Sequence, residues 1–324
     1  MKNIAYIFPG QGSQKVGMGK DLFDNYEEAR EVYKEANEVL GFDLARLCFE
    51  GPKEELDKTE NTQPAILATS VAALRVLDKE RKIEPSFVAG HSLGEYTALI
   101  CAGVLKFADA LRLVRLRGRF MQEAVGEGEG AMAAVLGFDS EKIWDLCKDA
   151  CTADEVVVPA NINSPVQVVI SGHKGAVERA GVAAREAGAK RVITLPVSVP
   201  SHSPLMKSAA EKLAEELKKI ELDDFKVALV SNVEAAPVNV KGSVPDLLVR
   251  QLTSPVRWVE IVRGLKEDGN IQVTVEIGPG KVLTNLINRI DGQLVTINID
   301  NTEDLIRAKN YLKKGRSSPV DFGV

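Results

Sequence analysis

The sequence predicts an α/β fold in two parts: a large domain with a mainly parallel sheet, and a small ferredoxin-like domain inserted into it. In the outer parts of the chain, five short apolar runs alternate with helical patterns, which is typical of a parallel sheet. A central stretch of about 70 residues has the element order βαββαβ. The glycine-rich run Gly126–Gly130 separates the two patterns. We therefore expect one domain at 1–127 and 197–324, and the other at 128–196.

The first part of the large domain begins with the apolar run Ile4–Phe8, which predicts a strand. A helix is expected over Asp21–Leu40, closed by Gly41. A second helix starts near Asn61–Pro64, because proline suits a first turn, and runs to about Arg81. Three further elements follow: a strand over Ser86–Ala89, and helices over Leu93–Cys101 and Lys106–Ala124.

The inserted domain is expected to contain, in order, the strand Ala131–Gly137, the helix Ser140–Ala150, the strands Val156–Ala160 and Val166–Ser171, the helix Gly175–Ala187 and the strand Arg191–Leu195. After Pro196 the earlier alternation returns, with helices over Pro204–Lys219, Val244–Leu252, Pro255–Asp268, Lys281–Arg289 and Thr302–Leu312, and strands over Lys226–Ser231, Ile271–Ile277 and Leu294–Ile299. The tail after Gly315 is expected to fray.

Composition excludes several classes of protein. The 324 residues are 45% hydrophobic and 27% charged, with a formal net charge of −5, which gives no sign of nucleic-acid binding. The sequence shows no apolar run long enough to span a membrane, and its start reads as a strand rather than a signal peptide. The four cysteines could include a metal pair at Cys147 and Cys151, but no histidine adjoins them. We therefore expect idle thiols, no metal and a cytoplasmic location.

The pentapeptide Gly90-His91-Ser92-Leu93-Gly94 lies between a predicted strand and a predicted helix. Glycines at both ends let two backbone segments pass closely, and the sharp turn lifts the hydroxyl of Ser92 clear of the sheet. A nucleophile needs this shape, because its attack creates an oxyanion close to a helix N-terminus. An ordinary serine in a glycine-rich connection is the alternative.

A serine nucleophile needs a general base, usually histidine, and the chain has three. His91 adjoins Ser92 and should point away from it, while His173 lies at a turn inside the small domain. His202 lies where the chain returns to the large domain, beside the expected cleft, and is the candidate base. No acidic residue adjoins His202, so a main-chain carbonyl or the segment Arg250–Leu252 is expected to orient it.

Two other segments are candidates for binding. The turn after the first strand, Pro9–Gln14, could point backbone N–H groups around Gln11 at an anion, or could be a plain turn. On the helix Lys106–Ala124, Arg117 alone among four arginines has only apolar neighbours at helical spacing. A buried guanidinium needs an anionic partner, which is either an internal carboxylate or a substrate carboxylate.

Taken together, these segments resemble the malonyl-CoA:acyl carrier protein transacylase family over residues 1 to about 290. The resemblance is carried by Phe8–Gln14, Thr62–Ala65, Gly90–Tyr96, Arg117-Gly118, Asn163–Pro165 with Gln167–Ile170, Val197–His202, Arg250–Leu252 and Glu276–Lys281. It implies a hydrolase-like large domain, Ser92 as nucleophile, His202 as base, and an oxyanion hole made by the N–H groups of Gln11 and Leu93. It also implies that Arg117 binds the malonyl carboxylate and that the carbonyl of Gln251 orients His202.

The resemblance further implies the reaction and its partners. A malonyl group would pass from malonyl-CoA to Ser92, and then to the phosphopantetheine thiol of acyl carrier protein, by a ping-pong mechanism for fatty-acid synthesis. Neither a metal nor a redox cofactor would be required, and neither a nucleic acid nor a membrane would be a partner. The alternatives are a serine esterase or thioesterase acting on acidic acyl groups, and a non-catalytic carrier-binding subunit of a larger synthase.

Overall fold

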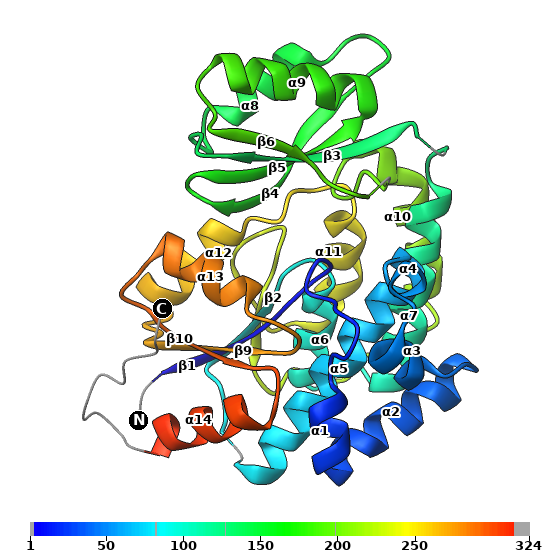
Figure 1. Ribbon diagram of the computed structural model, residues 1–324, viewed down its shortest axis with the longest axis vertical. Coiled ribbons are helices and arrows are strands. Elements are labelled where there is room, and N and C mark those ends of the chain that lie inside the picture. The colour runs from blue at the N-terminus through cyan, green and yellow to red at the C-terminus, as the bar shows by residue number, and fades with distance from the viewer. Residues whose placement is uncertain (1–2, 82, 127, 198, 314–324) are drawn as a thin grey trace.

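The computed structural model describes residues 3–81, 83–126, 128–197 and 199–313. Its strands form two separate sheets, and the smaller sheet lies above the larger one in the view of Figure 1. The larger sheet has the order β10-β9-β1-β2-β7-β8 and the smaller one the order β4-β5-β3-β6. The larger sheet consists of β1 (Ile4–Phe8), β2 (Phe87–Gly90), β7 (Ala228–Val230), β8 (Pro237–Val238), β9 (Val273–Ile277) and β10 (Val295–Ile299). The smaller sheet consists of β3 (Gly130–Leu136), β4 (Val157–Ser164), β5 (Gln167–His173) and β6 (Arg191–Thr194).

The larger sheet confirms the prediction of a mainly parallel arrangement. The strands β10, β9, β1, β2 and β7 all pair in parallel, and β8 alone is antiparallel, at the edge beside β7. The sequence did not predict β8, because a two-residue strand that begins with proline carries no apolar pattern. In this order, β1 and β2 lie side by side in the centre of the sheet, so the segments that follow them are neighbours as well.

Helices cover both faces of the larger sheet. They are α1 (Lys20–Asn25), α2 (Glu27–Leu40), α3 (Leu44–Glu50), α4 (Lys53–Leu56), α5 (Thr59–Glu80), α6 (Gly94–Cys101), α7 (Phe107–Glu123), α10 (Lys207–Leu217), α11 (Val244–Gln251), α12 (Trp258–Glu267), α13 (Val282–Ile290) and α14 (Thr302–Lys313), with the 3₁₀ turns η1 (Pro204–Met206) and η2 (Lys241–Ser243). Alternate residues of β1 belong to different cores: Tyr6 and Phe8 pack with α5, α6 and α7, whereas Ala5 and Ile7 pack with α12 and α13.

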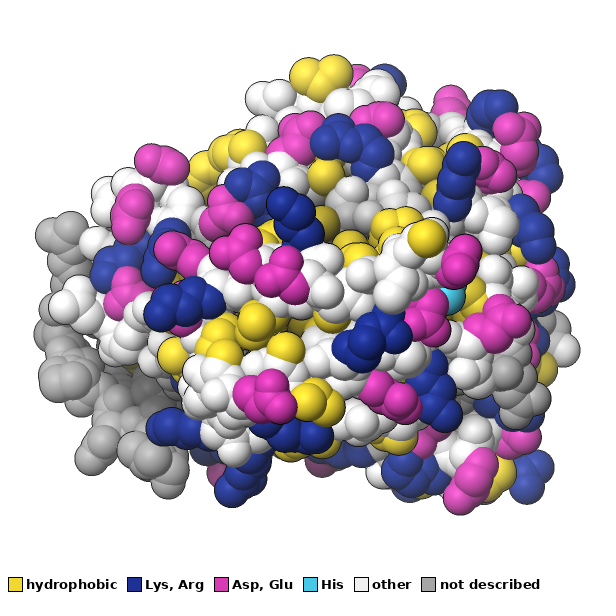
Figure 2. Space-filling model, turned by 90° about the horizontal axis from the view of Figure 1, so that it is seen from above, with side chains coloured by type: hydrophobic (Ala, Val, Ile, Leu, Met, Phe, Trp, Pro, Cys, Tyr) yellow, Lys and Arg dark blue, Asp and Glu magenta, His cyan; other side chains and the backbone are white. Residues whose placement is uncertain are grey.

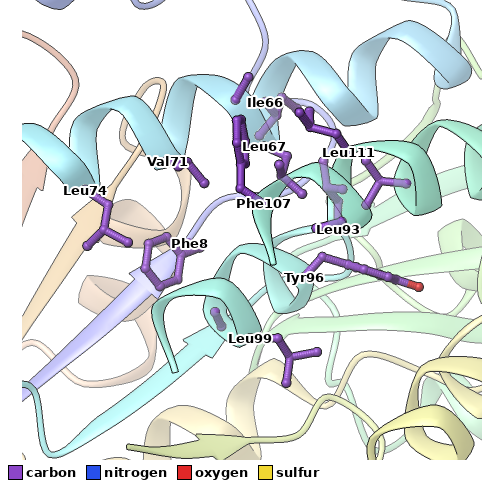
Figure 3. Packing of buried hydrophobic residues seen from close by; sticks show 14 of the residues in the cluster. Phe8, Ile66, Leu67, Val71, Leu74, Leu93, Tyr96, Leu99, Phe107 and Leu111 are labelled. Carbon is purple, nitrogen blue, oxygen red and sulfur yellow. The ribbon is translucent and has the colours of Figure 1, made fainter. Parts of the chain in front are cut away.

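The helix α5 fills the first of these cores. Its sequence is apolar around nearly the whole circumference, so it is buried along most of its length. Ile66, Leu67, Val71 and Leu74 of this helix meet Phe8 and side chains of α6 and α7 (Figure 3). This packing holds α6 and α7 against the central strands β1 and β2, the second of which leads to Ser92.

Beyond small shifts at helix ends, the predicted helices differ from the structure in three main respects. The expected helix 21–40 is two helices, because Tyr26 is extended with φ −130° and ψ 134°. Apolar spacing continues across this break, so the pattern does not reveal it. The helix expected from residue 61 begins at Thr59, which places Pro64 inside it. The helices α3 and α4 were missed, although Asp43 caps α3 by accepting a hydrogen bond from the Arg46 N–H at 3.0 Å.

The smaller sheet is antiparallel, and α8 (Ile143–Ala150) and α9 (Lys174–Glu186) pack on one of its faces. It meets the rest of the chain at a bridge between Asn161 and Val256, where Ile162 N–H donates to the Val256 carbonyl at 2.9 Å. Basic and acidic side chains are mixed over the face seen from this end of the molecule (Figure 2). Within the described residues, no helix is both long and apolar enough to cross a bilayer. The tail after Gly315 lies outside the described residues.

Gly118 lets α7 approach the start of α5. A Cβ atom there would lie 2.7 Å from the Glu60 Cα and from the Thr59 carbonyl oxygen. We expect Gly118→Ala to destabilise the protein by about 1–3 kcal/mol, because overpacking outweighs the gain in helix propensity. Gly264→Ala in α12 is the matched control, since its Cβ would meet nothing closer than 3.9 Å. That variant should stabilise the protein by up to about 1 kcal/mol. Urea denaturation measures both, and equal shifts would contradict the packing argument.

Candidate active site

Ser92 lies on a sharp turn between β2 and α6. Its backbone has φ 52°, a left-handed conformation that is costly for a residue with a Cβ atom. The flanking glycines make the turn possible: a Cβ on Gly90 would lie 2.0 Å from the Gly94 carbonyl, and a Cβ on Gly94 would lie 2.0 Å from the Phe8 oxygen. The side chain of Ser92 therefore stands at the end of the central strands, as the strand-turn-helix pattern predicts.

Asn232, which follows β7, holds this turn from the side. Its Oδ1 accepts a hydrogen bond from the Ser92 N–H at 2.7 Å, and its Nδ2 donates to the Gly90 carbonyl at 2.6 Å. The residue is fully buried, so both bonds form away from water. The side chain thus satisfies the backbone on both sides of His91 and fixes the direction in which Ser92 points.

His202 is the histidine that reaches Ser92. Its Nε2 lies 2.9 Å from Ser92 Oγ, and its Nδ1–H donates to the Gln251 carbonyl at 2.7 Å. With Nδ1 protonated, Nε2 of the neutral ring accepts the hydrogen bond from the Ser92 hydroxyl. Burial and the charge of Arg117 lower the pKa of His202 to about 3, so the ring is neutral at neutral pH and its Nε2 lone pair is free to accept the hydrogen bond from Ser92.

The other two histidines are held elsewhere. His91 Nε2 lies 2.8 Å from Asn163 Oδ1 on β4, and its ring packs edge-on against Trp258 with the centroids 5.6 Å apart. His173 Nδ1 accepts a hydrogen bond from the Val156 N–H within the small sheet. The bond between His91 and Asn163 instead connects the small sheet to the turn that carries Ser92.

Arg117 on α7 lies against Ser92 and is 1% exposed. Its Nη2 donates to Ser92 Oγ at 3.2 Å and to Gln251 Oε1 at 2.9 Å, and its Nη1 donates to Gln63 Oε1 at 2.8 Å. Among the described residues it forms no ion pair, and its buried Nε–H has no acceptor. Of the two partners open from the sequence, an internal carboxylate is therefore not in contact with this guanidinium. Burial lowers the pKa of Arg117.

Gln251 joins the separate groups through both its backbone and its side chain. The backbone carbonyl accepts from His202, while Oε1 accepts from Arg117 and Nε2 donates to the Ser92 carbonyl at 3.1 Å. Nε2 also donates to the buried Glu95 carboxyl, whose other oxygen accepts from the Asn232 N–H at 3.2 Å. Burial raises the pKa of Glu95 to about 7, against the opposing effect of these hydrogen bonds and of Arg117.

The two expected oxyanion-hole residues lie on neighbouring segments. The end of β1 contacts the turn directly, since the His91 N–H donates to the Phe8 carbonyl at 3.0 Å. Gln11 is exposed, and its side chain donates to Thr59 Oγ1 at 3.3 Å; Leu93 is buried and immediately precedes α6. Within the described part of the chain, neither backbone N–H donates a hydrogen bond, so both remain available to an oxyanion.

The sequence did not assign four of the contacts in this site. Gln63 and Glu95 lie within segments that carry the family resemblance, but nothing in their spacing indicates a contact with Arg117 or Gln251. Asn232 lies outside those segments. For Gln251, the family resemblance implies a role for the backbone carbonyl but gives no sign that the side chain also forms hydrogen bonds. Within the described residues, no three His, Cys, Asp or Glu side chains are close enough together to hold a metal ion, and Cys147 and Cys151 are free thiols.

Comparison with known proteins gives consistent matches over most of the chain. Residues 5–295 match the family model described as "Acyl transferase domain". The "Malonyl CoA-acyl carrier protein transacylase" of Escherichia coli strain K12 is 53% identical over 290 residues, which are 90% of this chain and 93% of that one. The protein of the same name from Haemophilus influenzae is 50% identical over 313 residues, or 96% of this chain and 100% of its own.

Solved structures agree in fold as well as in sequence. A Vibrio cholerae acyl carrier protein S-malonyltransferase has a TM-score of 0.92 and 48% identity, covering 94% of this chain and 99% of its own. A malonyl-transacylase in complex with a type II PKS acyl-carrier protein has a TM-score of 0.93 and 49% identity, covering 95% and 99%.

The role of Asn232 can be tested on the serine itself. We expect Asn232→Ala to slow the labelling of Ser92 by a neutral fluorophosphonate by about 10- to 100-fold, because the Ser92 N–H and the Gly90 carbonyl lose their buried partner. The rate of labelling, followed by intact mass, is the measurement. Asn298→Ala, which removes a side chain bonded to Asp304 on the far edge of the sheet, is the control. An unchanged rate in Asn232→Ala would show that the turn holds without it.

Proposed function

The chain belongs to the acyl transferase family and, within it, to the malonyl CoA-acyl carrier protein transacylases, and we propose from this premise that Ser92 carries the malonyl group from malonyl-CoA to acyl carrier protein. The observation that supports this most directly is the contact of Ser92 Oγ with two groups at once: His202 Nε2 at 2.9 Å and Arg117 Nη2 at 3.2 Å. One group takes up the proton, and the other is placed to meet a carboxylate on the acyl chain.

The proposed reaction has two halves. His202 accepts the hydroxyl proton while Ser92 Oγ attacks the thioester carbonyl, and the N–H groups of Gln11 and Leu93 stabilise the resulting oxyanion. Coenzyme A leaves with a proton, and a malonyl-Ser92 ester remains. The phosphopantetheine thiol of acyl carrier protein then attacks this ester, with His202 taking the thiol proton and returning it to Ser92. The Gln251 carbonyl keeps the imidazole in the tautomer that both halves need.

Arg117 is proposed to select the acyl group. Its present acceptors are neutral oxygens of Gln63, Gln251 and Ser92, so the guanidinium retains a full charge for a substrate carboxylate. A carboxylate can bind it through two parallel hydrogen bonds. An acetyl group offers no anion and cannot form these two hydrogen bonds, which favours malonyl over acetyl.

Four finer assignments stay within this proposal. We assign the small unit to the ferredoxin-like class, supported by its strand order and its two helices on one face. We propose that no metal or redox cofactor takes part, because serine, histidine and backbone donors supply nucleophile, base and oxyanion stabilisation. The cytoplasmic location remains a prediction from the sequence, as do the boundaries of the two domains.

The acyl-enzyme is the first test. Brief exposure to malonyl-CoA should add one malonyl group, and peptide mapping should place it on Ser92, because among the described residues that hydroxyl alone contacts His202. Ser92→Ala should remove the adduct. An adduct on a cysteine, or rapid release of free malonate in the presence of acyl carrier protein, would contradict transfer and favour a thioesterase. Intact-mass and peptide mass spectrometry provide both readouts.

Arg117 is the second test. Arg117→Ala should lower kcat/KM for acylation by malonyl-CoA by about two to four powers of ten, with about 3–5 kcal/mol for a broken buried pair as the upper guide. Acylation by acetyl-CoA should hold steady or improve, because acetyl has no carboxylate to bind to Arg117 and the smaller side chain leaves it more room. Arg119→Ala is the matched control, since Arg119 lies on the same helix but pairs with Glu123 at the surface. An equal loss for both thioesters would make Arg117 structural rather than selective.

A further inference from the structure

Glu95 is a buried carboxyl beside the site that the proposed reaction does not use. It lies on α6, three residues after Ser92, and is 1% exposed. Its two oxygens accept hydrogen bonds from the Gln251 side-chain amide and from the Asn232 N–H. Both donors are neutral, so neither cancels the charge that Glu95 carries when it is ionised. A buried carboxylate of this kind requires a cation within reach.

Arg117 is that cation, and one amide group joins the two charges. Gln251 Oε1 accepts from Arg117 Nη2 at 2.9 Å, while Nε2 of the same amide donates to Glu95. The guanidinium is as deeply buried as the carboxyl, and its hydrogen bonds end on neutral oxygens. In the empty site the two charges are therefore each other's partners across the Gln251 side chain, and the buried cluster is close to neutral.

This balance changes when the acyl group arrives, an argument that rests on the proposed function. A malonyl carboxylate on Arg117 would bring a second anion into a buried cluster that holds one cation. Like charges in such a site do not both remain ionised. Uptake of one proton from solvent by Glu95 restores the original balance: one positive guanidinium, one negative malonyl carboxylate and one neutral carboxylic acid.

We propose that Glu95 is the exchangeable counter-ion of Arg117, ionised while the site is empty and protonated once the substrate carboxylate has taken its place. Glu95 touches no reacting atom and acts through Arg117, so it is a positioning residue. An acetyl group carries no carboxylate and would leave Glu95 as it is. Selection of the acyl group would then include a proton that is taken up with malonyl and not with acetyl.

The ionisable groups that interact with Glu95 are Arg117 from α7 and Tyr96 from α6, and the two nearest histidines of the site are His202, which donates to the Gln251 carbonyl, and His91, which is bonded to Asn163. Burial raises the pKa of Tyr96 to about 12, lowers that of His202 to about 3, and lowers that of His91. Arg117 remains charged throughout the neutral range. Burial raises the pKa of Glu95 to about 7, so Glu95 is the member of this group that exchanges a proton near neutral pH.

Calorimetry measures the proton directly. Ser92→Ala protein, which cannot be acylated, is titrated with malonyl-CoA and with acetyl-CoA at pH 7 in phosphate and in Tris, two buffers that differ in ionisation enthalpy. Because burial raises the pKa of Glu95 to about 7, we expect malonyl-CoA to take up a measurable fraction of a proton more than acetyl-CoA at that pH, and a larger fraction at about pH 8. The coenzyme A phosphates are common to both ligands and cancel.

Two variants in the same background sharpen this measurement. Glu95→Gln should abolish the difference in proton uptake between the thioesters. Glu276→Gln is the matched control, because Glu276 is also a buried carboxyl whose pKa burial raises to about 7, yet it accepts hydrogen bonds from the N–H groups of Leu283 and Thr284 at the start of α13. That variant should keep the difference. Loss of the difference in Glu276→Gln but not in Glu95→Gln would overturn the assignment.

Kinetics of the enzyme with Ser92 unchanged provide a second, independent test. Because the malonyl complex binds the extra proton, the ratio of kcat/KM for malonyl-CoA to that for acetyl-CoA should fall as pH rises through 7, by up to about tenfold per unit above the Glu95 pKa. In Glu95→Gln the ratio should not depend on pH. A flat ratio in the unchanged enzyme, with equal proton uptake, would overturn the inference while a malonyl-Ser92 adduct still supported the proposed function. Absence of that adduct would overturn both.

Discussion

A buried guanidinium whose hydrogen bonds end on neutral oxygens is the constraint on which the site depends. Arg117 is held between Gln63 on α5, Gln251 on α11 and Ser92 at the end of β2. Those three groups come from segments far apart in the chain, and each must be in place for the charge to be tolerated. The packing of α7 on α5, the central position of β2 and the placement of α11 therefore serve one electrostatic requirement.

The second requirement is that the smaller sheet keeps a fixed position relative to Ser92. The His91 side chain reaches Asn163 on β4, and the backbone of Ile162 and Ala160 pairs with Val256 just before α12. The residue next to Ser92 is thus bonded to one sheet while Ser92 itself belongs to the other. A shift of the smaller sheet would displace the turn through His91. Both sheets therefore affect the position of Ser92.

Sequence reasoning was most effective where local geometry dictates residue type. The glycines around Ser92 and the left-handed Gly41 after α2 are required by the backbone itself, and their positions were predicted. The placement of His202 followed from eliminating two other histidines, and the structure brings its ring to Ser92. The apolar neighbours of Arg117 on α7 correctly indicated its burial.

The contacts that sequence reasoning missed depend on tertiary placement. Asn232 follows β7, 140 residues after Ser92, and no periodicity connects the two. Glu95 and Gln251 meet only because α6 and α11 converge on the same turn. The break at Tyr26 was invisible for a related reason, since tertiary packing decides it while the apolar spacing continues on both sides.

Both members of the serine–histidine pair occupy left-handed backbone, with φ 52° at Ser92 and φ 59° at His202. A conformation that disfavours every residue with a Cβ atom is one in which glycine would be the more comfortable choice. Selection for folding stability alone would therefore drive these two positions toward glycine, in the opposite direction to selection for reactivity. A redesign for heat resistance could rank substitutions by how well they fit the backbone. It would then replace Ser92 and His202 first, so these two positions must be held fixed.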